Sequence, residues 1–271
     1  MNAELARRYL ALLGVDPAPP SRSALTAITT AHLARVPFEN LSKLIGHGRG
    51  EPPGVPPIAR YLDGIEHLAL GGTCYACAFG LHALLGHLGY EVRLCGAAMT
   101  RPDVHVVNVV TLDGEDWLVD VGYGAPLLAP LPLGSRRPQT VVRGAEQWTL
   151  QPRDTTGRSR LEHRRDGEVV HGYTLDPAAR RTAYFAPMIA DSFRPGAGFL
   201  TRLRVARHDG RRTISVRDRT VTVVDGDAVR QRILDADEEL CGVVEVLLKI
   251  PASVTAEALA ALARNRASGA P

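Results

Sequence analysis

Residues 71–90 read GGTCYACAFGLHALLGHLGY, which joins a double glycine, a cysteine and a long apolar pattern. Apolar side chains recur there at the three- and four-residue spacing of a largely buried helix: Ala76, Leu81, Leu84, Leu85 and Leu88. Gly86 and Gly89 indicate the end of this helix. We therefore expect Cys74 in the first turn of a buried helix that begins directly after two glycines.

Other helical patterns lie near the two ends of the chain. Apolar residues have helical spacing in the segments 3–14, 22–35, 57–65, 236–249 and 254–265. Ser21 or Ser23 is a suitable N-cap for the second of these helices, and Pro37 ends it. The Gly/Pro-rich residues 46–57 are expected to form a loop.

Strand patterns fill the middle of the chain. They include EVRLCGAAM (91–99), HVVNVVTL (105–112), DWLVDVGYG (116–124), shorter runs at 147–151, 160–164 and 168–174, and three strands after residue 199. Asp113-Gly114 and Asp166-Gly167 are strong hairpin signals. Strict alternation of strands and helices is absent, so the pattern predicts an α+β fold in three parts.

The composition is that of an ordinary globular protein without a nucleic-acid partner. The chain has 271 residues, is 45% hydrophobic and 23% charged, and has a net charge of +3. No basic stripe interleaved with aromatic residues is visible. No run approaches the roughly 20 apolar residues of a membrane span, and Glu4, Arg7 and Arg8 interrupt the apolar pattern that an export signal needs. With four cysteines, we expect a cytoplasmic protein with free thiols.

Cys74 has the surroundings of a nucleophile. A double glycine allows close backbone approach, and free N–H groups and the positive dipole end of the helix favour the thiolate. His105 begins an otherwise apolar strand, and Asp120 ends the apolar run Trp117-Leu118-Val119, where an acid needs a partner. The hairpin places His105 and Asp120 near the same open end, so the carboxylate can orient the imidazole that activates Cys74.

These residues occur within several motifs that stand in a familiar order. The motifs are VPFENL at 36–41, GGTCY at 71–75, the strand that begins at His105, and VDVGYG at 119–124. They follow the order of the arylamine N-acetyltransferases, and His32-Leu33 before the first motif is also similar. The resemblance covers the N-terminal half well and the remainder in outline, through Pro195 and Phe199.

The resemblance implies a fold and a site. It implies a helical bundle (1–88) that bears the nucleophile, a β-barrel (89–190) that bears the histidine and the aspartate, and an α/β lid (191–271), around a core like that of the cysteine proteases. Cys74, His105 and Asp120 would be the catalytic triad. Phe38, Tyr123 and Gly124 would bind substrate.

The resemblance also implies a reaction. An acetyl or other acyl group would move from a CoA thioester to Cys74 and then to a small aromatic amine or hydrazine, in a ping-pong mechanism. Acetyl-CoA, or another acyl thioester, would be a co-substrate, and no metal and no permanently bound cofactor are expected.

The motif around the nucleophile departs from the family pattern R-G-G-x-C-x-E-x-N. Leu70, Ala76 and Ala78 stand where Arg, Glu and Asn are expected. An ion-paired Arg and Glu would be lost together, because losing one partner strands a buried charge at a cost of about 3–5 kcal/mol. The sequence thus resembles a divergent branch in which the triad is intact.

Other functions remain open at this point. Relatives of this fold close amide bonds on polyketide-type acyl thioesters, and a thiol hydrolase uses the same residue order. A catalytically silent binding protein is a third class. Cys74 and Cys77 form a CxxC, but Cys95 and Cys241 supply no second pair for zinc, and a redox site lacks its βαβ context. We expect Cys77 to pack inside; its oxidation with Cys74 is a side hypothesis.

Overall fold

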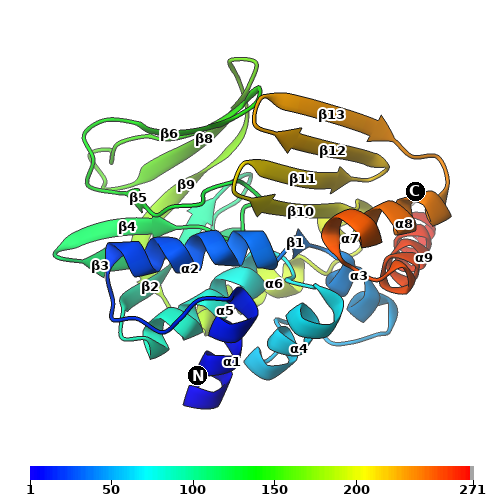
Figure 1. Cartoon of the computed structure of the whole chain (residues 1–271), viewed down its shortest axis with the longest axis horizontal. Helices are drawn as coiled ribbons and strands as arrows, with labels where there is room; N and C mark the ends of the chain where they lie inside the picture. The colour runs from blue at the N-terminus through cyan, green and yellow to red at the C-terminus, as the bar shows by residue number, and fades with distance from the viewer. Residues whose placement is uncertain (269–271) are drawn as a thin grey trace.

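The computed structural model describes residues 1–268 (Figure 1). Four helices pack around one hydrophobic core: α1 (Ala3–Leu13), α2 (Arg22–Arg35), α4 (Ile58–Leu68) and α5 (Cys74–His87). Leu81 and Leu84 of α5 are fully buried in it. The Ser21 side chain accepts a hydrogen bond from the Ala24 N–H at 3.2 Å, which confirms Ser21 as the cap of α2.

The central strands form a nearly closed antiparallel barrel. Its strand order is β5-β4-β3-β2-β9-β8-β7-β6. The strands are β2 (Glu91–Ala98), β3 (His105–Leu112), β4 (Glu115–Val119), β5 (Leu131–Pro132), β6 (Gln139–Arg143), β7 (Glu146–Leu150), β8 (Ser159–Arg165) and β9 (Glu168–Arg180). Asp113 and Gly114 both have positive φ, 51° and 77°, as a tight turn between β3 and β4 requires. The predicted hairpin is confirmed.

The last part of the chain forms a second antiparallel sheet covered by helices. It contains β1 (Phe38–Glu39), β10 (Arg204–Asp209), β11 (Arg212–Arg217), β12 (Thr220–Asp225) and β13 (Ala228–Ile233), in that order. Its core is shared with α3 (Leu41–Gly48), α8 (Asp237–Leu248) and α9 (Ala252–Ser268). Figure 1 shows this sheet and these helices at one end of the molecule and the barrel at the other. A strand and a helix that precede Cys74 thus belong to the C-terminal sheet and core.

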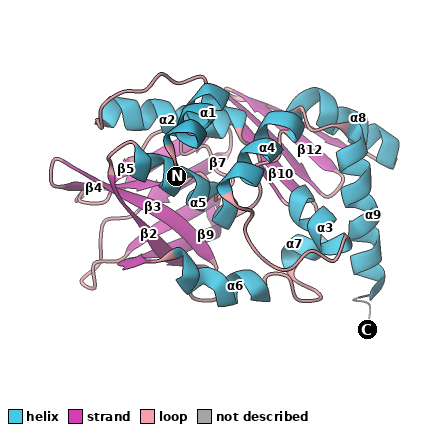
Figure 2. Ribbon diagram, turned by 90° about the horizontal axis from the view of Figure 1, so that it is seen from below, coloured by secondary structure: helices cyan, strands magenta, loops and turns pink. Residues whose placement is uncertain are grey.

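Short helices connect the barrel to the C-terminal sheet. The 3₁₀ helix η1 (Thr182–Phe185) leads into α6 (Ala186–Asp191), and α7 (Gly198–Thr201) precedes β10. Phe185 and Ile189 belong to one buried cluster with Leu94 and Val106 of the barrel and with Cys74. Figure 2 shows α6 below β2 and β9. Side chains of the barrel, η1 and α6 therefore pack together with the first residue of α5.

Several segments differ from the prediction, and the strands β1, β5 and β6 were not predicted. Residues 46–48, expected in a loop, form the last turn of α3. Strand β13 was not predicted, because all six of its residues are exposed and give no apolar alternation. Strand β9 continues to Arg180 rather than ending at residue 174, and Pro177 conceals this continuation.

The predicted fold class is confirmed. The chain is α+β, with N-terminal helices, a nearly closed eight-stranded barrel, and a C-terminal sheet with its own helices. Within residues 1–268 the helices are all too short or too polar to cross a membrane.

Candidate active site

Cys74 begins α5 at the end of a tight glycine loop. A Cβ at Gly71 would lie 2.2 Å from the Pro37 carbonyl oxygen, so no larger residue fits there. Gly72 has φ of 76°, which disfavours any other residue. Thr73, the N-cap residue, makes no capping hydrogen bond through its side chain within the described chain. The first N–H groups of α5 therefore lack this cap beside the Cys74 sulfur.

Glu39 fixes this loop through hydrogen bonds to Gly72. Its buried carboxylate accepts hydrogen bonds from the Gly72 N–H at 2.6 Å and from the N–H and hydroxyl of Ser42 at 2.8 Å each. The Glu39 N–H donates to the Gly72 carbonyl at 3.0 Å. Burial raises the pKa of Glu39, and the bonds from Ser42 and Gly72 oppose that rise. Glu39 belongs to the motif VPFENL, but the sequence alone assigned it no role.

Asn40 joins the nucleophile loop to the C-terminal sheet. Its side-chain amide donates to the carbonyls of Phe199 and Arg202, at 2.7 Å each. Its side-chain oxygen accepts from the Arg204 N–H at 2.7 Å. The buried side chain of Asn40 thus connects the segment that contains Glu39 to the start of β10.

His105 and Asp120 meet as predicted. The His105 Nε2 lies 2.9 Å from Asp120 Oδ2, and both side chains are buried. The Gly122 N–H donates to Asp120 Oδ1 at 2.9 Å, and the Tyr173 hydroxyl donates to Asp120 Oδ2 at 2.8 Å. Three donors therefore satisfy a carboxylate that burial alone would destabilise.

The surroundings of His105 favour its protonated form. Burial of the ring lowers its pKa, but the charge and hydrogen bond of Asp120 raise it, as do a hydrogen bond and charge from Cys74. The result is a pKa raised from 6.5 to about 10. Because His105 Nε2 is hydrogen-bonded to Asp120, His105 Nδ1 is the ring nitrogen that can form the hydrogen bond with Cys74. The structure thus brings the three predicted catalytic residues together.

Of the three predicted substrate-binding residues, Tyr123 lies next to this group, and Gly124 lies beside Phe38. The Tyr123 ring centroid is 5.7 Å from that of His105, and the Tyr123 hydroxyl is 2.6 Å from His171 Nδ1. Gly124 has φ of 73°, and a Cβ there would lie 3.6 Å from the Phe38 ring. The Phe38 ring in turn contacts Phe199 at a centroid distance of 5.9 Å.

Gly122 packs directly on the nucleophile. A Cβ at this position would lie 2.7 Å from the Cα of Cys74 and 3.0 Å from its carbonyl oxygen. The glycine therefore lets the turn after β4 contact the first residue of α5. Because Gly122 lies in the motif VDVGYG, the sequence alone could have indicated that a glycine is needed beside the nucleophile.

Tyr173 and Lys43 were missed by sequence reasoning. Tyr173 bonds to an acid 53 residues away, and no local pattern points to that partner. Lys43 and Lys249 are the two lysines of the chain, and this rarity was a signal that could have drawn attention to Lys43.

Cys77 supports the loop rather than facing solvent. Its thiol donates to the Gly71 carbonyl at 3.3 Å, and burial raises its pKa well above the usual value. All four cysteines are free thiols. Among residues 1–268, no group of three or more His, Cys, Asp or Glu side chains is placed to hold a metal ion.

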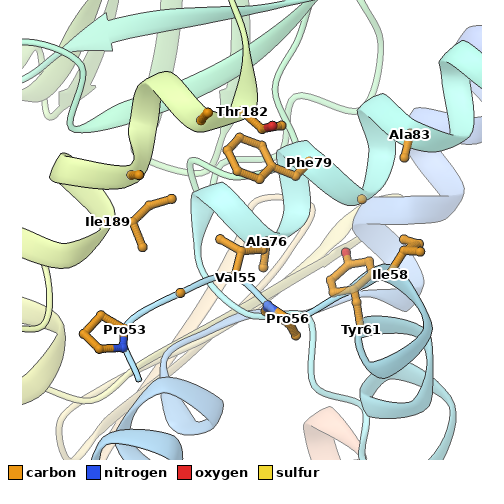
Figure 3. A pocket seen from close by; sticks show the side chains of 14 residues that line it. Pro53, Val55, Pro56, Ile58, Tyr61, Ala76, Phe79, Ala83, Thr182 and Ile189 are labelled. Atoms are coloured by element: carbon orange, nitrogen blue, oxygen red, sulfur yellow. The ribbon is translucent and has the colours of Figure 1, made fainter. Parts of the chain in front are cut away.

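A cavity of about 450 Å³ lies on another face of α5 (Figure 3). Ala76 and Phe79 line it, together with Val55, Tyr61 and Ile189, whereas the three predicted catalytic residues do not. Ala76 is where the nucleophile motif departs from its usual Glu. The small side chain at this position therefore faces a mainly apolar cavity.

Comparison with known proteins identifies the family of this chain. A family model described as N-acetyltransferase matches residues 23–255. The arylamine N-acetyltransferase of Mycolicibacterium smegmatis is 31% identical over 211 residues, which cover 73% of this chain and 74% of the relative. Proansamycin X synthase of Amycolatopsis mediterranei (strain S699) is 30% identical over 197 residues, which cover 66% and 72%.

The fold agrees as well. The crystal structure of the arylamine N-acetyltransferase of Nocardia farcinica superposes with a TM-score of 0.80 at 26% identity, and covers 96% of this chain and 95% of that one. The family model spans most of the chain, and the similarity of sequence and fold extends beyond the site. The chain belongs to the arylamine N-acetyltransferase family of enzymes.

Proposed function

We propose that this acyltransferase moves an acetyl or other acyl group from a CoA thioester to an aromatic amine or hydrazine, with Cys74, His105 and Asp120 as its catalytic residues. The observation that carries the proposal is the buried chain of contacts from Cys74 to His105 to Asp120, at the uncapped start of α5. The buried free cysteines fit a cytoplasmic enzyme.

The first half-reaction acylates the cysteine. The Cys74 thiolate, paired with the protonated His105, attacks the thioester carbonyl. N–H groups at the start of α5 stabilise the negative oxygen that develops there. The C–S bond to CoA breaks, and the leaving thiolate takes the proton of His105. Asp120 holds the imidazole in place throughout.

The second half-reaction transfers the acyl group to the amine. The amine nitrogen attacks the acyl-cysteine while His105 accepts its proton. Cys74 leaves as thiolate, and the pair with protonated His105 is restored. We place the acceptor against Phe38, Tyr123 and Gly124. Aromatic side chains suit an aromatic amine, because their rings stack on its face.

A second candidate reaction is amide formation on a polyketide-type acyl thioester. The similarity to proansamycin X synthase, over 66% of this chain, favours it as the alternative. Both reactions pass through the same acyl-cysteine, so they differ in the acyl group and the amine.

Intact-mass spectrometry after incubation with a panel of acyl-CoAs tests the shared step. We expect one acyl group per chain, located on Cys74 by peptide fragmentation and released when aniline is added. Cys241 on α8 provides the matched control, because Cys241→Ala removes another buried thiol of the chain. Cys74→Ala should give no adduct, and Cys241→Ala a normal one. No adduct on the wild-type protein with any donor would refute the proposal.

A further inference from the structure

Lys43 places a cation in the aromatic cluster that includes Phe38. Its ammonium lies 4.0 Å from the Phe193 ring centroid and 5.9 Å from that of Phe199, and it donates to the Ser192 hydroxyl at 2.6 Å. Phe199 also contacts Phe38. Phe199 therefore links the ammonium to Phe38, one of the residues that we propose bind the acceptor.

In the part of the chain that the structure describes, no acidic side chain forms an ion pair with this cation. Within residues 1–268, no carboxylate lies within 4.0 Å of the Lys43 ammonium. Asp191, next to Ser192, is paired instead with Arg101 at 2.5 Å and Arg194 at 3.0 Å. An ammonium has three hydrogens to donate, and Ser192 accepts one. A partly buried ammonium without an anion is costly, so this position favours an anionic ligand.

Lys43 is also within electrostatic reach of the nucleophile. Burial lowers its pKa to about 8, and the charge of Cys74 opposes that change. The connection is structural as well, because Ser42, the preceding residue, donates to Glu39, which holds Gly72. A molecule that reacts at Cys74 and carries an acid group can therefore direct that group toward Lys43.

We propose that Lys43 is a specificity residue that binds a carboxylate on one of the two substrates, either on the aromatic amine or at the end of a dicarboxylic acyl group. The inference rests on the proposed function. Phe193 and Phe199 beside the ammonium, with Phe38 next to Phe199, supply apolar contacts for the remainder of the substrate. The ammonium supplies the charged hydrogen bonds that distinguish an acid from its neutral analogue.

Two pairs of substrates distinguish the sources of the carboxylate. With acetyl-CoA as donor, kcat/KM is compared for 4-aminobenzoate and 4-aminobenzamide. With aniline as acceptor, it is compared for malonyl-CoA and butyryl-CoA. In Lys43→Met, one of the two acid-to-neutral ratios should fall by about 10- to 100-fold, as for the loss of a hydrogen bond to a charged group. The ratio that falls identifies the substrate.

Lys249→Met is the matched control, because Lys249 is the other lysine and is exposed at the end of α8. It should leave both ratios unchanged. If neither acid-to-neutral ratio changes in Lys43→Met, the inference is overturned. Equal losses of kcat/KM on the acid and the neutral substrate also leave the ratio unchanged, and they would indicate an effect on the Cys74 thiolate. Intact-mass acetylation of wild-type Cys74 on the same preparation tests the proposed function separately.

A titration covers the case in which Lys43→Met does not fold. Reductive ¹³C-methylation labels the two lysines and the N-terminus, so the NMR spectrum is simple. Bound 4-aminobenzoate or malonyl-CoA should raise the pKa of Lys43, whereas the neutral analogue of each should not. An unchanged Lys43 pKa with both saturating acids would overturn the inference.

Discussion

Tyr173 donates its hydroxyl hydrogen to Asp120 Oδ2 at 2.8 Å, the same oxygen that lies 2.9 Å from His105 Nε2. The Tyr173 ring also lies against the imidazole, at a centroid distance of 4.9 Å. Tyr173 thus touches both members of the pair and fixes the angle between them. We regard it as a positioning residue, because it acts on Cys74 only through His105.

Replacing Tyr173 by Phe should destabilise the protein and slow the acylation of Cys74. The change leaves a buried charged oxygen with one donor fewer, which costs about 1–3 kcal/mol. Urea unfolding measures the stability, and the rate of acyl-adduct formation measures the second effect. Tyr184→Phe is the control, since the Tyr184 hydroxyl donates to Asp103 at 2.7 Å on the exposed surface. Equal losses in the two variants would contradict a special role for Tyr173.

Asp120→Asn should reduce acyl transfer by about 1,000- to 10,000-fold, because the amide presents the imidazole in the wrong tautomer. Cys74→Ala should abolish it. Steady-state kinetics with acetyl-CoA and aniline tests both. The neighbouring acid Asp116 pairs with Arg93 and Arg153, at 2.7 Å each, and Asp116→Asn should retain activity. Near-normal turnover of Asp120→Asn would exclude it as the orienting acid.

Gly122→Ala should displace the nucleophile. The added Cβ would lie 2.7 Å from the Cα of Cys74, and relieving such overlap in a packed interior costs about 1–3 kcal/mol. We expect a lower melting temperature and slower alkylation of Cys74 by iodoacetamide. At Gly134 a Cβ would meet no atom within 4 Å, so Gly134→Ala should match the wild type. Wild-type alkylation of Gly122→Ala would show that the contact tolerates a methyl group.

The protonation of His105 should make stability depend on pH. The folded protein raises the pKa of His105 from 6.5 to about 10, so the folded state holds a proton that the unfolded chain releases. This stabilisation is fully present below pH 6.5 and is lost as the pH rises through about 10. The free-energy gap between wild type and His105→Gln, measured by urea unfolding, should therefore narrow from pH 6.5 to pH 10. A free-energy gap that widens with pH would show that folding does not raise the pKa of His105.

Much of the fold could be predicted because its signals are local. The apolar spacing of α5, the Asp113-Gly114 turn and the Ser21 cap each depend on a few neighbouring residues. Strand β13 could not, since its exposed residues satisfy backbone pairing without burying an apolar face. The last turn of α3 was concealed by glycines, which are tolerated there because α3 packs against α9.

The candidate site was predictable where chemistry requires a residue type. A thiol after two glycines, and a histidine and an acid at the ends of apolar strands, are informative without a structure. The supporting contacts were not, because they join distant segments: Tyr173 to Asp120, and Asn40 to Phe199. Lys43 is the same case, since only the folded chain shows that its neighbours are aromatic and that no acid among residues 1–268 pairs with it.

The hydrogen bonds of Asn40 also join parts of the chain that are synthesised far apart in time. Cys74, His105 and Asp120 are all synthesised before residue 121, whereas the carbonyls that Asn40 binds belong to Phe199 and Arg202. A nascent or truncated chain that stops near residue 190 would contain all three of these residues, but the segment beside the Cys74 loop would lack the partners of Asn40. Synthesis past Arg204, at the start of β10, therefore supplies the last of the partners that Asn40 bonds to beside the Cys74 loop.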